Sequence, residues 1–271
     1  MSTTMTPSRP RATSVVNHPV TVRRAISSEW IKFRSLRSTA AVLGAAMASM
    51  VILALVIAFN TRRITPKLQL DDHVQSSTLQ GFLLAQLLVG ALGVLFSSGE
   101  YSTGMIRSTL VAVPKRLPVL WAKLVVFVTG TAVSMILISV LSFLAAQALI
   151  GQYRTGYSLG DPGVLRVVVG TGVYLTLVGV LGLCLGWILR STPGALVTHA
   201  GLLLILGLVL GFLGSWGKTV AQFLPGNAGE AFIRTLPHTP ALTPWTGLGV
   251  LCLWVVGAIA VAAVQLHRHD A

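Results

Sequence analysis

The sequence predicts an all-α, polytopic membrane protein with six transmembrane helices. Hydrophobic residues make up 54% of the 271 residues and charged residues only 10%, against roughly 25% charged in an ordinary soluble domain. The hydrophobic residues gather into runs of about twenty, the length that crosses a bilayer core of ~30 Å. A soluble core of this size would show amphipathic patterning instead.

The N-terminal region has two parts with different compositions. Residues 1–19 are rich in Ser, Thr and Pro, which predicts a disordered tail before a six-span domain over 20–271. Residues 20–37 predict an amphipathic helix whose apolar face carries Val22, Ile26, Trp30 and Phe33. The opposite face carries Arg24, Ser28, Lys32 and Ser35. A basic helix of this kind lies flat at the lipid headgroups; the alternative is a plain juxtamembrane charge cluster.

Six hydrophobic runs follow the amphipathic segment. We expect spans over residues 39–59, 79–97, 121–149, 164–189, 194–213 and 245–266. The third run is longer than a membrane requires, so its start is expected to project into the aqueous phase. The loop over 214–244 alternates short apolar pieces with Gly and Pro, and it holds either short helices at the outer interface or a plain loop.

The Lys and Arg residues predict the orientation of the spans. With six spans both termini lie on one side, and the segments on that side hold 13 of the 20 basic residues, against seven in the other three loops. The positive-inside rule therefore places both termini and the segment 99–123 in the cytoplasm.

Charge and cysteine content exclude several function classes. The net charge of +13 is explained by basic residues flanking the spans, and no basic stripe is interleaved with stacking aromatics, which argues against nucleic-acid binding. Cys184 and Cys252 both lie inside apolar runs and form neither a disulfide framework nor a CxxC pair.

Motifs of catalysis and ion coupling are not found. Only seven Asp and Glu occur, none at the centre of a predicted span, which disfavours intramembrane proteolysis and secondary transport. His199 without a visible partner is interpreted as a packing or helix–helix hydrogen-bonding residue. The stretch GFLGSWGKT at 211–219 fails the spacing of a phosphate-binding loop by one residue. Gly182–Gly186 and Gly207–Gly211 are GxxxG pairs that permit close helix approach.

The polar stretch GEYSTGMIRSTLVAVPKRLPVLWAK at 99–123 separates two spans. Gly99 and Gly104 are expected to loosen the helix that leaves the second span, and Pro118 suits the first turn of the next helix. Between them we expect a short transverse helix that docks into a groove of a soluble partner; the alternative is a polar connector resting on lipid. The docking helix would carry Met105, Ile106 and Leu110 beside Arg107, and would end at Pro114.

Several motifs along the chain resemble those of type-2 ABC exporter permeases, in particular actinobacterial members. The loop order Glu-Tyr, Gly-Met-Ile-Arg, Thr-Leu, Pro-Lys-Arg and Ala-Lys is similar to the family's first cytoplasmic loop, with Met105 at a place usually held by Thr. Glu29-Trp30-x-Lys32 looks like the family's elbow helix, Leu189-Arg190-Ser191-Thr192 like its turn between spans four and five, and residues 224–229 like an outer segment.

The resemblance implies the membrane subunit of an exporter in the bacterial cytoplasmic membrane. Two such six-span units, as a homodimer or with a related permease, would each dock on a separate ABC ATPase, which alone would bind ATP and Mg²⁺ and carry the enzymatic activity. The expected ATPase-docking residues are Glu100, Tyr101, Gly104, Met105, Ile106, Arg107, Leu110, Pro114 and Arg116. The expected elbow residues are Glu29, Trp30, Lys32 and Phe33.

Two points stay open at this level. Glu100 is expected to be a polar anchor at the end of a helix, paired with a basic residue of the elbow or of the third span. The alternative function is a non-transporting sensor, immunity or assembly protein of the same fold, favoured by the lack of a polar substrate site within the spans; a hydrophobic or amphipathic substrate explains the same lack.

Overall fold

The chain is helical in a computed structural model that describes residues 22–61, 79–102, 116–151, 157–235 and 242–268, and no strand occurs in these ranges. The helices are α1 Val22–Ser35, α2 Arg37–Thr61, α4 Phe82–Ser102, α6 Arg116–Ile150, α7 Val164–Leu189, α8 Thr192–Ala200, the π-helix η1 Gly201–Ile205, α9 Leu206–Gly211, α10 Gly214–Ala221, α11 Pro225–Ile233 and α12 Pro244–Arg268.

Six stretches of the described chain are long and apolar enough to cross a membrane. They are Arg37–Asn60, Phe82–Gly99, Leu120–Ile150, Val164–Leu189, Thr192–Gly211 and Pro244–Leu266. Each boundary lies within about three residues of the predicted one, the error usual for hydropathy and end signals. The prediction of an all-α fold with six spans is therefore confirmed.

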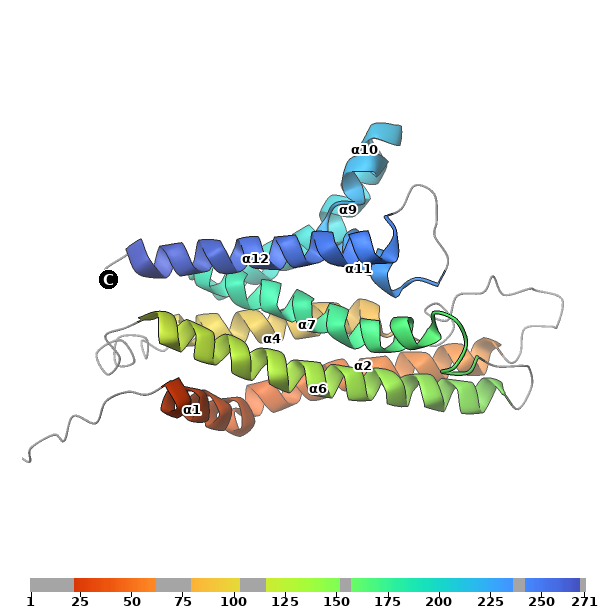
Figure 1. Cartoon of the computed structure of the whole chain (residues 1–271), viewed down its shortest axis with the longest axis horizontal. Helices are drawn as coiled ribbons and strands as arrows, with labels where there is room; N and C mark the ends of the chain where they lie inside the picture. The colour runs from red at the N-terminus through yellow and green to blue at the C-terminus, as the bar shows by residue number, and fades with distance from the viewer. Residues whose placement is uncertain (1–21, 62–78, 103–115, 152–156, 236–241, 269–271) are drawn as a thin grey trace, which may run out of the picture.

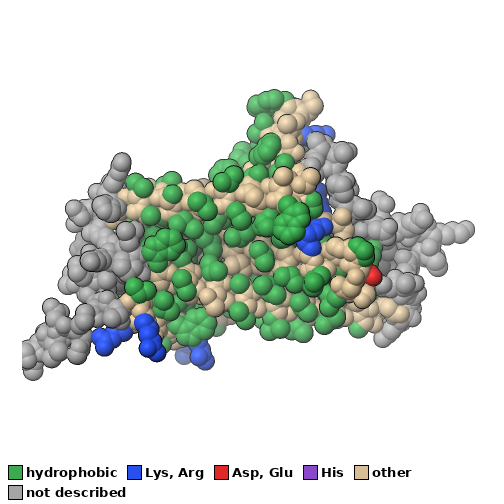
Figure 2. Space-filling model, in the orientation of Figure 1, with side chains coloured by type: hydrophobic (Ala, Val, Ile, Leu, Met, Phe, Trp, Pro, Cys, Tyr) green, Lys and Arg blue, Asp and Glu red, His purple; other side chains and the backbone are tan. Residues whose placement is uncertain are grey.

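The spans form one bundle around α7. In Figure 1 they run mainly along the horizontal axis, with α1 and the last residues of α12 at the left and α11 toward the right, while α9 at the end of the fifth span rises toward α10. We call these the α1 end and the α11 end. Helix α7 packs against α4, α6, α11 and α12 and is the most buried of the spans. Figure 2 shows hydrophobic side chains across the middle of the visible face and Lys and Arg nearer its ends.

Small residues bring α4 and α7 into close contact. Gly182 of α7 lies directly against the backbone carbonyl of Gly90 in α4, and Gly186 lies against the side chain of Ser97. A Cβ atom on either glycine would overlap these neighbours, so the interface excludes larger side chains. The predicted close approach at Gly182–Gly186 is confirmed. At the Gly207–Gly211 pair, no atom lies within 4 Å of a Cβ built on Gly211. This pair therefore does not form a close contact between two spans.

The fifth span differs from the single helix that was predicted. Helix α8 passes into the five-residue π-helix η1, which is followed by the short helix α9. A π-helix closes i→i+5 hydrogen bonds and is wider than an α-helix. Hydropathy identifies the span correctly because the stretch Thr192–Gly211 is apolar as a whole, but it does not detect the change of winding.

Two short helices occupy the segment after the fifth span, so the helical alternative for the loop is correct, and its location at the outer interface stays a prediction. Helix α10 stands away from the bundle in Figure 1, whereas α11 is buried against α7, α12 and η1. Gly229 of α11 lies against the ring of Tyr174, and Gly226 lies against the carbonyl of Leu203. The glycines allow α11 to sit deeper than a helix with larger side chains could.

The C-terminal end of α11 is held by Arg166, near the start of α7. Its guanidinium donates hydrogen bonds to the backbone carbonyl oxygens of Phe232 and of Arg234, the second at 2.9 Å. The last carbonyls of a helix lack partners within the helix, and a cation at this end also interacts favourably with the helix dipole. Arg234 in turn forms an ion pair with Glu230 at 2.6 Å.

An Arg166→Gln variant is expected to loosen α11 without unfolding the bundle. Hydrogen bonds to charged groups contribute about 1.5–3 kcal/mol each, so exchange of the amides over 225–234 should accelerate by roughly tenfold or more. Hydrogen–deuterium exchange of the full chain in detergent measures this, with a Lys218→Gln variant as the matched loss of one positive charge nearby. Equal protection of 225–234 in wild type and Arg166→Gln would show that Arg166 does not hold the helix.

Candidate functional site

Three helices meet at the α1 end, where α1 lies across α4 and α6. Phe33 is the apolar centre of this junction. Its ring stands perpendicular to the rings of Phe96 and Phe127, with centroids 5.6 and 6.5 Å away. Gly130 leaves space for it, because a Cβ atom there would lie 2.6 Å from the Phe33 ring. Edge-to-face aromatic pairs stabilise such a contact beyond their buried area.

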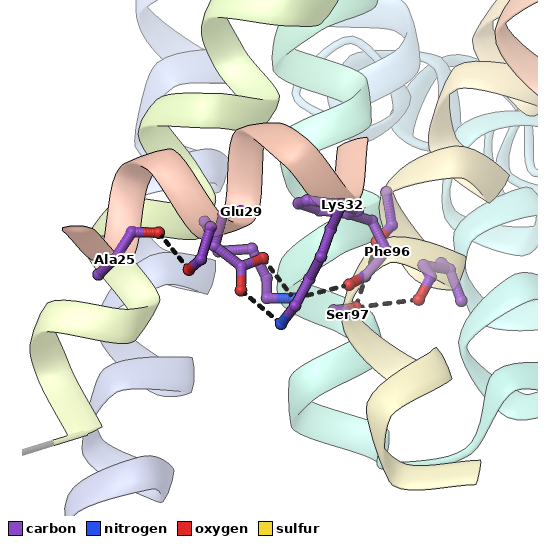
Figure 3. A network of polar contacts seen from close by, with 9 residues as sticks. Ala25, Glu29, Lys32, Phe96 and Ser97 are labelled. Atoms are coloured by element: carbon purple, nitrogen blue, oxygen red, sulfur yellow. Dashed lines mark hydrogen bonds and ion pairs between the residues drawn. The ribbon is translucent and has the colours of Figure 1, made fainter. Parts of the chain in front are cut away.

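A buried ion-pair network lies beside this aromatic cluster (Figure 3). Glu29 of α1 is only 3% exposed, and its Oε1 accepts a hydrogen bond from Lys32 Nζ at 2.8 Å. Its Oε2 lies 3.2 Å from Nζ of Lys123, which is in α6 and 1% exposed. The second contact is an ion pair, and Oε2 accepts no hydrogen bond from the described residues.

Lys123 joins all three helices of the junction. Besides its ion pair with Glu29, Nζ donates a hydrogen bond of 3.1 Å to the backbone carbonyl of Phe96 in α4 and lies 4.5 Å from the centre of that ring. A buried charge is tolerated only where it is paired and hydrogen-bonded, and here carboxylate, carbonyl and ring face the ammonium together. We name Glu29, Lys32, Phe33, Phe96 and Lys123 the α1 junction.

The expected amphipathic helix is present as α1, and its placement at the lipid headgroups stays a prediction. Phe33 and Glu29 face the bundle, whereas Val22 and Trp30 are exposed and Lys32 is only half-buried. The reason is that the Glu29–Lys123 contact turns the helix so that a charged residue faces inward. The predicted range 20–37 was too long at its end, because α1 stops at Ser35 and α2 begins at Arg37.

One prediction for the flanks of segment 99–123 needs correction. Helix α4 continues through Gly99 to Ser102, since the roughly 1 kcal/mol cost of a helical glycine does not end a helix whose hydrogen bonds continue. Helix α6 is long, with 35 residues, and Lys123 near its start is buried against α1 and α4; the projection of this start beyond the membrane stays a prediction. Pro118 does lie in the first turn of α6, as predicted.

Most of the predicted docking residues lie outside the described residues. The backbones of Glu100 and Tyr101 belong to the last turn of α4, and Arg116 is the first residue of α6; their side chains are not described. The remaining predicted docking residues, outside the described ranges altogether, are Gly104, Met105, Ile106, Arg107, Leu110 and Pro114. The structure therefore gives no partner for Glu100, and the predicted transverse helix also falls in this part of the chain.

The α1 junction nevertheless flanks that segment on both sides. Phe96 and Lys123 are each about two helical turns from the ends at Ser102 and Arg116. On its other side the end of α4 is tied to α8, where the hydroxyls of Ser98 and Thr192 share a hydrogen bond of 2.8 Å. A displacement of the segment would therefore reach α1, α4, α6 and α8 through direct contacts.

A second polar cluster lies inside the bundle. The Tyr174 hydroxyl donates a hydrogen bond to Gln86 Oε1, and both residues are buried. His199 is buried against Gly90, and its ring nitrogens have no hydrogen-bond partner among the described residues. The packing interpretation of His199 agrees with this position. Sequence reasoning missed Gln86 and Tyr174, although a glutamine within an apolar span is a signal in itself.

Comparison with known proteins assigns the chain to no family. No protein-family model matches it, and a search of curated proteins finds no significant match. Within the described ranges no three His, Cys, Asp or Glu side chains are grouped so that they could hold a metal ion. The fold defines a multi-pass α-helical membrane protein. Within the part of the chain that the structure describes, the buried Asp, Glu, Lys and Arg side chains are those of Glu29 and Lys123, which both belong to the α1 junction.

Proposed function

We propose that this chain is the permease subunit of an ATP-driven ABC exporter. It would move a hydrophobic or amphipathic substrate outward across the bacterial cytoplasmic membrane, with both termini inside. A separate ATPase subunit would bind ATP and Mg²⁺, and a second permease copy, identical or related, would complete the transporter.

The observation that carries the proposal is the attachment of α1 to the helices on both sides of segment 99–123. Glu29 and Lys123 form a buried ion pair across this junction, and Lys123 also bonds α4. Breaking a buried pair costs about 3–5 kcal/mol, so the three helix ends should move together as one body. An ATPase docked on the segment could then transmit its closure to several spans at once.

Mutations of the docking segment test the proposal. Co-expressed with a candidate ABC ATPase, such as the product of a neighbouring gene, the chain should purify as a complex and stimulate ATP hydrolysis. An Ile106→Asp variant should weaken the complex roughly 10- to 100-fold, because burying an isoleucine contributes about 1.5–3 kcal/mol. An Arg107→Glu variant should weaken it too, whereas Arg34→Glu, an exposed charge reversal on α1, should not.

The outcomes separate the two functions. Failure to form any complex, or unchanged binding by Ile106→Asp and Arg107→Glu, would contradict ATPase docking through this segment. A stable complex that stimulates ATP hydrolysis but exports no labelled hydrophobic compound would favour the non-transporting alternative. Export that requires both subunits and is lost in Ile106→Asp would support the exporter.

A further inference from the structure

A cavity of about 260 Å³ opens between α9, α10 and α11 at the α11 end. Gly207 and Gly211 of α9 form one wall, Lys218 comes from α10, and Asn227 and Arg234 come from α11 and the residue after it. Asn227 Nδ2 donates a hydrogen bond of 2.8 Å to the carbonyl of Ala221 at the end of α10. This bond ties α10 to α11, so the cavity is walled by elements that are fixed to one another.

The cavity is positively charged. Lys218 and Arg234 both line it, and Arg166 lies close by, bonded to the carbonyl of Arg234. Glu230 is paired with Arg234 and offsets one of these three charges. The described side chains around the cavity therefore leave an excess of positive charge, which favours an anion.

The cavity lies at the end of a predicted membrane span, beside apolar side chains that lipid can contact. Its α9 wall is the last part of the span Thr192–Gly211, so the cavity lies at the depth where a bilayer places its headgroups. Between Gly207 and Gly211, α9 exposes apolar side chains, with Leu208 65% and Val209 50% exposed. Exposed Phe212, Trp216 and Trp245 surround the same end, and aromatic residues concentrate at the membrane–water interface.

We propose that this cavity binds the headgroup of an anionic phospholipid, whose acyl chains lie along the exposed face of α9. The volume supports a headgroup, because pockets for whole drug-sized molecules measure about 300–1,000 Å³. The phosphate would lie between Lys218 and Arg234, with the amide of Asn227 as a further donor. The site is independent of the ATPase-docking proposal and would exist in either function.

Lipid retention by the full chain tests the site. The protein is purified in neutral detergent and incubated with phosphatidylglycerol or phosphatidylcholine, and native mass spectrometry counts the retained lipids. Lys218→Gln should reduce the preference for phosphatidylglycerol about fivefold, the effect of losing one partly solvated ionic contact. Gly211→Leu should abolish it by filling the cavity, and it should fold, because a Cβ there meets no neighbour within 4 Å.

Two matched variants serve as controls. Gly249→Leu adds the same side chain to an open position on α12, and Arg34→Gln removes a charge at the α1 end; both should keep the preference. Equal retention of phosphatidylglycerol by wild type, Lys218→Gln and Gly211→Leu would overturn the proposal. Stabilisation by inorganic phosphate with no preference between the lipids would overturn the lipid assignment, whereas displacement of bound phosphatidylglycerol by phosphate would support it.

Discussion

A Gly182→Leu variant is expected to lose about 3 kcal/mol or more of folding free energy, at the upper end of what overpacking costs. The new side chain would overlap the backbone carbonyl of Gly90, across the contact between α4 and α7. Backbone cannot rotate away as a flexible side chain can, so the two central helices must separate. The measurement is the thermal unfolding midpoint of the purified chain in detergent, together with its elution as a monodisperse peak.

Gly257→Leu is the matched control for this substitution. Gly257 lies in α12 with nothing within 4 Å of a Cβ atom, so leucine should be neutral there or slightly stabilising, since glycine costs a helix about 1 kcal/mol. If Gly182→Leu and Gly257→Leu unfold at the same temperature as wild type, the close contact of α4 and α7 is not a determinant of the fold.

Removing the carboxylate of Glu29 is the second change with a large expected effect. A Glu29→Gln variant takes from Lys123 the ion pair at 3.2 Å while the lysine stays buried, and breaking a buried pair from one side costs about 3–5 kcal/mol. We expect a lower unfolding midpoint and faster proteolysis near α1. Lys32→Gln should cost at most about 1 kcal/mol, because that side chain is 31% exposed and water replaces the contact.

A double variant tests whether Lys123 stabilises the junction through its ion pair with Glu29 or through its other contacts. Replacing a buried ion pair by apolar side chains is often neutral, so Glu29→Gln combined with Lys123→Met should recover most of the stability lost in Glu29→Gln. Additive losses in the double variant would mean that Lys123 stabilises the junction chiefly through Phe96 and not through the carboxylate.

Hydropathy was sufficient to predict the spans because each is a continuous apolar run, and a run of this length has one stable arrangement in a bilayer. The packing of α4 on α7 could be predicted in part, since Gly182 and Gly186 recur at helical spacing. The orientation of residues that is determined by long-range contacts could not be predicted from the sequence. Glu29 faces inward because of Lys123, 94 residues further along the chain, and helical periodicity alone assigns a glutamate to the polar face.

For the polar contacts of the site, too, the sequence predicts the local elements but not the long-range partners. The sequence identifies α1 and places Glu29 and Phe33 on it, but not which neighbouring helix each touches. Tyr174 and Gln86 each stand between apolar neighbours in an apolar span, and only the packing of α4 on α7 joins them. The short helices α10 and α11 were predicted as one of two alternatives, because Gly and Pro mark helix ends without determining how deep the helices lie.

The π-helix η1 also determines the direction in which the following helix faces. An i→i+5 ring holds one residue more than an α-helical ring, so residues after Ile205 are out of phase with those before Gly201 by about 100°, the rotation of one residue. Deleting one residue from this five-residue stretch would restore regular winding and turn Gly207 away from Asn227, which lies close to it. One additional residue in mid-span thus determines which side of α9 forms the cavity wall.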